Sequence, residues 1–486
     1  MEAQQLEAAF DQQEIAAVVE RVRLKLRGRH AEAPPSIPVE ADIAVGDGIY
    51  PDVNAAVAAA RRAFETYRSM GLKGRHRIID AVRTAMRDRA EELARLAHDE
   101  TGIGRTEDKI LKNRLVIEKT PGPEDLEPRV WSGDQGLTVT EYAPYGVIGA
   151  ITPTTNTTAT IINNTIAIVS AGNAVVFNAH PNAKRVSVQN VRWLNQAILS
   201  AGGPPDLVTA TPEPTIDSAQ RLMNHPQVRI LMITGGPGVV KEAQKTRKRA
   251  ICAGPGNPPV VVDANADLEL AGREIVRGAS FDNNVICTDE KLIIVVDSAA
   301  DSLLKEMVKN NSYLLKEYEL KKLERVIFSE IGEPGKPGRV SPRWIGQNAG
   351  TILAEIGIQA GDDLRLVLAD VPAEHSLVWT EQMMPVMPVV RVRTVDEAID
   401  LAIRAEHGCG HTASIYSRDV NAITRMARDI DVSIFVANAA NLAGLGDGGE
   451  GYTSFSIASP TGEGLTRPRS FSRDRRMTVA GGLRIV

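Results

Sequence analysis

The pattern of apolar and polar residues predicts a short amphipathic helix at the start of the chain. Within residues 1–27 the apolar side chains recur at multiples of four positions, at Leu6, Phe10, Val18, Val22 and Leu26. This spacing places them on one face of a helix, apart from the charged residues. Residues 28–45 contain three prolines and several alanines, which predicts a semi-extended linker. The helix therefore either docks on the protein's own core or binds a groove of another protein.

Beyond the linker the pattern is first helical, from residue 51 to residue 118, and then alternates between strands and helices. Short runs rich in β-branched residues lie at 147–151, 174–177, 230–234, 259–263 and 291–296, and helical patterns lie between such runs, as at 183–199 and 267–279. Alternation of this kind is typical of α/β proteins with parallel sheets and crossover helices. Residues 137–142 and 475–486 are predicted to be extended segments that do not belong to this alternation of strands and helices. Because strands that leave a main sheet often pair between subunits, we expect a closed oligomer.

Composition and charge narrow the functional classes. The 486 residues include 56 Lys and Arg against 61 Asp and Glu, a net charge of −5, so no overall basic field draws the chain to nucleic acid or to anionic lipid. The first residues lack the unbroken apolar run of a secretory signal. Residues 142–183 carry no charged side chain, but their asparagines and threonines would need partners inside a membrane. We therefore expect a soluble enzyme in which this stretch is buried.

Three cysteines, Cys252, Cys287 and Cys409, are too few and too widely spaced for a disulfide scaffold or a C-x-x-C metal site. This count fits a reducing compartment, and no metal is expected. Cys287 lies between a helical pattern and a strand, after Asn283 and Asn284. The pKa of a thiol can fall at such a position, and the thiolate is the nucleophilic form. Taken alone, however, a cysteine is more often a small apolar core residue than a nucleophile.

Two further segments place polar or flexible residues at the ends of predicted strands. Asn156 follows the run at 147–151, where its amide can point two N–H groups into a cleft at the carboxyl end of a sheet. The alternative is that Asn156 caps the next helix. Thr234, Gly235 and Gly236 follow a later strand in a turn that can approach a cofactor closely, although the segment contains no G-x-G-x-x-G motif.

Taken together, these segments resemble the aldehyde dehydrogenase superfamily, and most closely its CoA-acylating branch from bacterial microcompartments. The resemblance covers roughly residues 46–486 and rests on ITPTTN, FDNNVIC, EQMMPVMPVV and SIASPTGEG. It implies an aldehyde dehydrogenase-like α/β fold with a Rossmann-like NAD/CoA-binding domain at 46–131 and 146–258, a catalytic domain at 259–455, and oligomerisation strands at 132–145 and 470–486. Residues 1–27 are similar to the N-terminal encapsulation helix of such enzymes.

The resemblance also implies a role for each candidate residue. Cys287 would be the nucleophile that adds to the aldehyde, and the Asn156 amide and the Cys287 backbone N–H would hold the resulting oxyanion. Glu381, which opens EQMMPVMPVV, would bind the nicotinamide ribose of NAD. The turn residues near the pyrophosphate would be Thr234, Gly235 and Gly236.

Two departures from the family pattern bear on the reaction. Hydrolytic members carry a glutamate in an E-L-G-G-K motif, whereas this chain has A-G-P-G-N, with Ala253 at the glutamate's place. Water, with a pKa of about 15.7, needs a base to attack a thioester, whereas a thiol with a pKa of about 8.5 is already partly thiolate at neutral pH. Loss of the glutamate thus favours transfer to coenzyme A. At 178–181 a common lysine–proline motif is absent, which leaves the choice between NAD and NADP open.

The sequence therefore predicts an NAD-dependent, CoA-acylating oxidoreductase for a short aliphatic aldehyde such as propionaldehyde or acetaldehyde. We expect it in the bacterial cytoplasm inside a microcompartment, bound to shell proteins through residues 1–27, as a homodimer or homotetramer. Two alternatives are a hydrolytic or reductive relative, and a non-catalytic scaffold associated with the shell. His180 and His411 are expected outside the catalytic set. Five C-terminal arginines form either a solvated or inter-subunit ion-pair surface or a phosphate site for coenzyme A: Arg467, Arg469, Arg473, Arg475 and Arg476.

Overall fold

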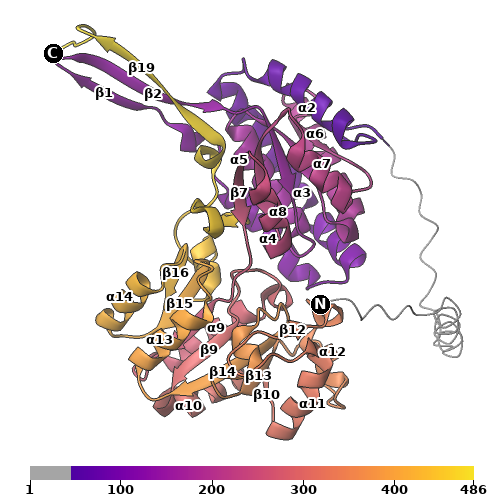
Figure 1. Cartoon of the computed structure of the whole chain (residues 1–486), viewed down its shortest axis with the longest axis vertical. Helices are drawn as coiled ribbons and strands as arrows, with labels where there is room; N and C mark the ends of the chain where they lie inside the picture. Colours follow the sequence, from indigo (N-terminus) through magenta and orange to yellow (C-terminus); the bar gives the residue numbers. More distant parts are fainter. Residues whose placement is uncertain (1–44) are drawn as a thin grey trace, which may run out of the picture. The chain divides into compact units, whose positions relative to one another are not determined.

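A computed structural model of the protein describes residues 45–486 (Figure 1). The first large sheet contains five parallel strands. The predicted helix at 1–27 and residues 28–44 of its linker lie outside the described residues. The strand order is β5-β4-β3-β6-β7. The strands are β3 (Val147–Ile151), β4 (Ala174–Asn178), β5 (Val208–Ala210), β6 (Val228–Thr234) and β7 (Arg249–Ala253). The order reverses between β3 and β6, and open parallel sheets bind ligands at the carboxyl ends of the strands that flank such a reversal.

Helices connect these strands, as the alternating pattern predicts. The stretch from residue 51 to residue 118 divides into three helices, and α3 ends at Gly102 because the left-handed φ of 65° at that glycine stops the helix. The helices of this part of the chain are α2 (Val53–Tyr67), α3 (Leu72–Thr101), α4 (Thr106–Lys119), α5 (Thr157–Ser170), α6 (Lys184–Ser200), α7 (Ile216–Asn224) and α8 (Pro237–Lys245).

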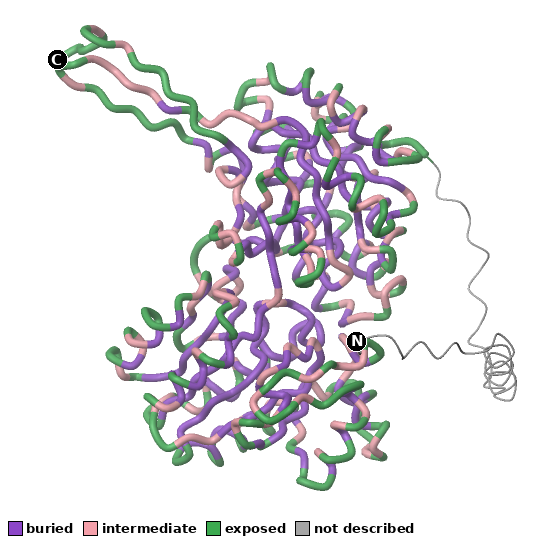
Figure 2. Tube along the Cα trace, viewed as in Figure 1, coloured by how far each residue is buried: buried purple, intermediate pink, exposed green. Residues whose placement is uncertain are grey.

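The uncharged residues 142–183 form the centre of the first sheet. Every residue of β3, α5 and β4 is buried (Figure 2). The polar groups of this stretch find partners inside the protein; Asn163, for example, donates to Thr120 Oγ1 at 2.9 Å and accepts from the Phe455 backbone N–H at 3.2 Å. Within residues 45–486 no helix is both long and apolar enough to cross a membrane.

The second large sheet contains seven parallel strands in the order β10-β13-β14-β9-β8-β15-β16. Its strands are β8 (Pro259–Val262), β9 (Leu292–Val296), β10 (Ser312–Leu314), β13 (Leu366–Asp370), β14 (Val386–Val392), β15 (Thr412–Tyr416) and β16 (Ile434–Ala437). The accompanying helices are α9 (Leu268–Ala279), α10 (Asp297–Lys309), α11 (Glu317–Ile327), α12 (Ala349–Ala354), α13 (Val395–Ala405) and α14 (Val420–Asp429).

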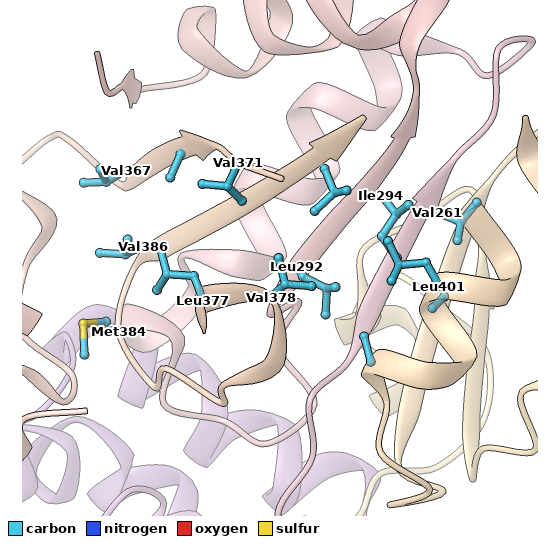
Figure 3. Close-up of a cluster of buried hydrophobic side chains, with 14 of the residues drawn as sticks. Val261, Leu292, Ile294, Val367, Val371, Leu377, Val378, Met384, Val386 and Leu401 are labelled. Atoms are coloured by element: carbon cyan, nitrogen blue, oxygen red, sulfur yellow. The ribbon is translucent and has the colours of Figure 1, made fainter. Parts of the chain in front are cut away.

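Both faces of this second sheet are covered. Val261, Leu292 and Ile294 pack on one face in a cluster that includes residues of α13 (Figure 3). Their neighbours Val260 and Ile293 point to the opposite face, into a cluster with residues of α9 and α10. Burial on both faces explains why these strands appear in the sequence as continuous apolar runs rather than as alternating patterns.

A three-stranded antiparallel sheet extends away from the two large sheets (Figures 1 and 2). It consists of β1 (Arg129–Gly133), β2 (Gly136–Pro144) and β19 (Ser472–Ala480), with β2 in the centre. Val130, Trp131 and Met477 are exposed on it. β1 begins three residues before the predicted oligomerisation segment, because the hairpin turn pairs Arg129 with Thr140. The oligomerisation role and the other domain functions stay predictions.

Candidate active site

A cavity of about 890 Å³ lies at the carboxyl ends of β3, β6 and β7, beside the reversal of strand order. All six residues predicted for the site line this cavity: Asn156, Thr234, Gly235, Gly236, Cys287 and Glu381. Ala253, the last residue of β7, lines it as well. Segments more than two hundred residues apart in the sequence thus meet at one site, as open α/β sheets place their ligands.

Cys287 is carried by a loop with an unusual backbone. The short helix η3 (Phe281–Asn284) contains three consecutive left-handed residues, since Asp282, Asn283 and Asn284 have φ values of 45°, 56° and 65°. Asn and Asp tolerate this conformation better than other non-glycine residues, which explains the D-N-N run before the cysteine. The fully buried Lys291 stabilises this loop, because its Nζ donates to the Asn284 carbonyl at 2.7 Å and to the Ile286 carbonyl at 3.0 Å.

The environment of Cys287 disfavours the thiolate in the free protein. Burial raises the pKa of the Cys287 thiol to about 12, and the nearby carboxylate of Glu381 adds to the increase. The positive charge of Lys291 and the backbone N–H of Cys287 itself act in the opposite direction. In the free protein Cys287 is therefore a protonated thiol at neutral pH, because burial outweighs the two groups that favour the anion.

Asn156 occupies the N-cap position of α5, but its side chain makes no capping hydrogen bond. Instead, its Oδ1 accepts from Lys112 Nζ at 2.7 Å. Only 7% of Asn156 is exposed, and among residues 45–486 its Nδ2 has no hydrogen-bond partner. The alternative reading as a helix cap is thus wrong for the side chain, and its two amide N–H groups stay available to a ligand in the cavity.

The turn after β6 leaves backbone groups accessible at the start of α8. Gly236 is the N-cap of α8, and no atom lies within 4 Å of the position that a Cβ would take there. The first N–H groups of a helix are donors for anionic groups such as phosphate. The Gly235 N–H is bonded to the Ala253 carbonyl at 3.1 Å, and the Thr234 hydroxyl lies 2.8 Å from that of Ser456. The free donors of this turn therefore belong to the helix end rather than to Thr234.

Glu381 lines the cavity from the loop that precedes β14 of the second sheet. Its Oε1 accepts from the Gly256 backbone N–H at 3.4 Å, and burial raises the pKa of this carboxyl despite the opposing charge of Lys291. A carboxylate with one weak protein donor has free lone pairs for hydroxyl groups of a ligand.

Two histidines and the C-terminal arginines contribute less. His180 lines the cavity, and burial lowers its pKa. His411 is fully buried, and burial lowers its pKa to about 4, so it is neutral at neutral pH. Within the described residues none of the five arginines lines the cavity. Arg467 and Arg469 lie 3.4 and 3.7 Å from Asp125 of the same chain.

The sequence gives no sign of a buried ionic cluster beneath the site. Lys109 and Lys112 of α4 both pair with Asp282, whose side chain is fully buried. Burial lowers the pKa of Lys112 to about 8, and the charge of Asp282 opposes the decrease. The one available signal is the spacing of the two lysines, three residues apart in α4, which places them on the same helix face.

Comparisons with known proteins agree with this geometry. The model of the aldehyde dehydrogenase family matches residues 41–317 and 365–455, and the chain belongs to this family. It is 47% identical over 478 residues to the acetylating acetaldehyde dehydrogenase EutE of Salmonella typhimurium, an alignment that covers 98% of this chain and 100% of that protein. The predicted superfamily and fold class are thereby confirmed.

Two solved structures show the same fold. A propionaldehyde dehydrogenase of Rhodopseudomonas palustris, solved with bound CoA and an acylated cysteine, is 46% identical with a TM-score of 0.88, over 91% of this chain and 100% of that one. A propionaldehyde dehydrogenase from the fucose utilisation bacterial microcompartment of Clostridium phytofermentans is 42% identical with a TM-score of 0.87, over 90% of this chain and 100% of that one.

Proposed function

We propose that this protein is an NAD-dependent, CoA-acylating aldehyde dehydrogenase that oxidises a short aliphatic aldehyde, propionaldehyde or acetaldehyde, to its acyl-CoA. The observation that carries the proposal is the meeting of Cys287, Asn156 and Ala253 in one cavity. The proposed nucleophile and the proposed amide donor thus share a cavity with Ala253, which stands where the resemblance expects a glutamate in hydrolytic members. The relatives that use CoA, by their names and titles, support the same reading.

The cavity residues fit a dinucleotide. The open position at Gly236 and the N-terminal end of α8 suit a pyrophosphate, and Glu381 suits a ribose diol. When bound, NAD supplies the oxidant by accepting a hydride from the carbon attached to Cys287. The chain's own residues have to hold the aldehyde, stabilise the alkoxide and exclude water.

The first half-reaction forms a thioester on Cys287. The thiol gives its proton to solvent, and its sulfur bonds to the carbonyl carbon while the C=O π pair moves to oxygen. The resulting alkoxide accepts hydrogen bonds from Asn156 Nδ2 and from the Cys287 backbone N–H. As the hydride leaves, the alkoxide lone pair restores the C=O bond, and the acyl group remains on sulfur.

The second half-reaction transfers the acyl group to coenzyme A. The CoA thiol loses its proton, a bond forms between the CoA sulfur and the acyl carbon, and the bond from that carbon to Cys287 Sγ breaks. Cys287 leaves as the thiolate and takes up a proton, which restores the thiol. Aldehyde, NAD⁺ and CoA thus give acyl-CoA, NADH and one proton. Ala253, only 4% exposed, offers no base to activate water. The thioester on Cys287 therefore resists hydrolysis until the thiol of coenzyme A attacks it.

The test measures NADH formation with aldehydes of increasing chain length, each with and without coenzyme A, and identifies the product. The proposal predicts sustained turnover and acyl-CoA only when coenzyme A is present. Equal steady rates without it, or free acid as the product, would establish the hydrolytic alternative. Cys287→Ala should abolish the activity, whereas Cys409→Ala, at a partly buried cysteine that does not line the cavity, should retain it. Absence of activity in the unaltered protein would favour the scaffold.

For location, we propose that residues 1–27 bind shell proteins of a bacterial microcompartment. Their apolar stripe and the following proline-containing linker support this role, as does the microcompartment origin of the Clostridium relative. Deletion of residues 1–27 should leave the specific activity unchanged and abolish co-sedimentation with shells. Retained co-sedimentation would refute the role.

For assembly, we propose a homodimer or homotetramer that forms through β1, β2 and β19. Val130 and Met477 are both exposed and share one face of this sheet, because each pairs with Val139, and a second copy would cover this face. Changing Val130 and Met477 together to serine should lower the mass measured by light scattering. An unchanged mass would place the contact elsewhere.

A further inference from the structure

Lys112 contacts the proposed oxyanion donor directly, from outside the cavity. Its Nζ lies 2.7 Å from Asn156 Oδ1 and 3.3 Å from the Thr155 carbonyl oxygen. Lys112 does not line the cavity, and only 2% of it is exposed. We propose that Lys112 is a positioning residue that holds the Asn156 amide with Nδ2 facing the substrate oxygen. The proposal rests on the function proposed above and adds a residue to it.

The chemistry of the pair determines which way the amide faces. A lysine has N–H donors and, when protonated, no acceptor, so the atom of Asn156 that it contacts has to be the oxygen. Rotation of the amide by half a turn would bring two donor groups together in a buried site and turn Oδ1 toward the cavity. There the oxygen would repel an alkoxide instead of binding it. Because both residues are nearly excluded from solvent, water cannot substitute for the lost partner.

Lys112 is itself held by a fully buried carboxylate. Asp282 pairs with Lys112, accepts from Lys109 Nζ at 2.9 Å, and accepts from the Arg105 backbone N–H at 2.7 Å. Asp282 also opens the left-handed run that leads to Cys287. The same carboxylate thereby links the lysine behind Asn156 to the loop that carries the nucleophile, so the two proposed oxyanion donors share one support.

Lys109 provides a matched control. It lies one turn before Lys112 in α4, is buried to a similar extent and pairs with the same carboxylate of Asp282. Unlike Lys112, it makes no hydrogen bond to Asn156. Changing Lys109 to methionine removes one buried ion pair, as Lys112→Met does, and leaves the amide contact in place. A difference in rate between the two variants therefore reports on the contacts that Lys112 alone makes, to Asn156 and to the Thr155 carbonyl, and an Asn156→Ala background separates the two.

The experiment measures the single-turnover rate of NADH formation with saturating propionaldehyde and NAD, without coenzyme A, in the full-length protein. We expect Lys112→Met to slow this step by about 10-fold or more with an unchanged KM for NAD, and Lys109→Met to change it by less than about 3-fold. In an Asn156→Ala background the Lys112→Met change should have an effect of less than about 2-fold, because residues that act through one another are not additive.

Equal slowing by Lys112→Met in both backgrounds, or equal slowing by the two lysine variants, would overturn the positioning role. If Lys112→Met does not fold, Lys112→Gln replaces it in the same cycle; glutamine is one atom shorter and uncharged, so slowing is again expected only when Asn156 is present. Absence of slowing, or equal slowing in both backgrounds, would contradict the proposal. Failure of the unaltered protein to form NADH at all would instead refute the proposed function.

Discussion

Replacement of Asn156 by alanine removes one of the two proposed oxyanion donors and leaves the surrounding support in place. Lys112 keeps Asp282 and the Thr155 carbonyl as acceptors, so the fold should tolerate the change. Asn156 lines the cavity and is only 7% exposed, so little solvent reaches the position of the lost amide. A preorganised donor of this kind is worth about 2.7–4 kcal/mol in the transition state, or roughly 100- to 1000-fold in rate.

The assay for Asn156→Ala is the rate of NADH formation in a single turnover, with the melting temperature as a control for folding. We expect the loss to appear in this rate and the KM for NAD to stay within about threefold, because an interaction made only in the transition state does not affect cofactor binding. Slowing of less than about threefold in a folded variant would refute the oxyanion role of the amide.

Three further predictions test separate parts of the site. Because the pKa of Cys287 is raised to about 12, its thiol is protonated below that pH. Alkylation of Cys287 in the free protein should therefore accelerate about tenfold per pH unit from pH 7 to 10, and a plateau near neutral pH would contradict this. Ala253→Glu restores a base at the end of β7 and should release free acid without coenzyme A, detectable by chromatography; no acid would show that a base at this position is not sufficient. Gly104→Ala should lower the melting temperature more than Gly102→Ala, because both glycines have positive φ but only the Cβ at 104 would meet Asp282, at 1.9 Å; equal losses would exclude the clash.

The sequence predicts those helices and strands whose patterns depend only on residues close together in the chain. The β-branched run at 147–151 and the helical pattern at 183–199 correspond to β3 and α6, because alternation and helical spacing are properties of neighbouring residues. The order of the strands is not local: that β6 returns to pair with β3 depends on packing of the connecting helices, and no residue pattern encodes it directly.

The same distinction applies to the site. The sequence predicts Cys287 and Asn156 because short motifs around them resemble a family, and the structure brings both to one cavity. The sequence does not predict a role for Lys112, because its partner Asp282 lies 170 residues away in the chain and a lysine on a helix is normally at the surface. Only the folded structure shows that this lysine is buried and directed at the amide.

The covalent state of Cys287 tests the proposed function most directly. The protein is incubated with propionaldehyde and NAD in the absence of coenzyme A, and the peptide that contains Cys287 is examined by mass spectrometry. We predict a propionyl group on this cysteine that persists in buffer and, on addition of coenzyme A, is converted into an equal amount of propionyl-CoA. An unmodified cysteine, or an adduct that is lost as free propionate without coenzyme A, would contradict the account.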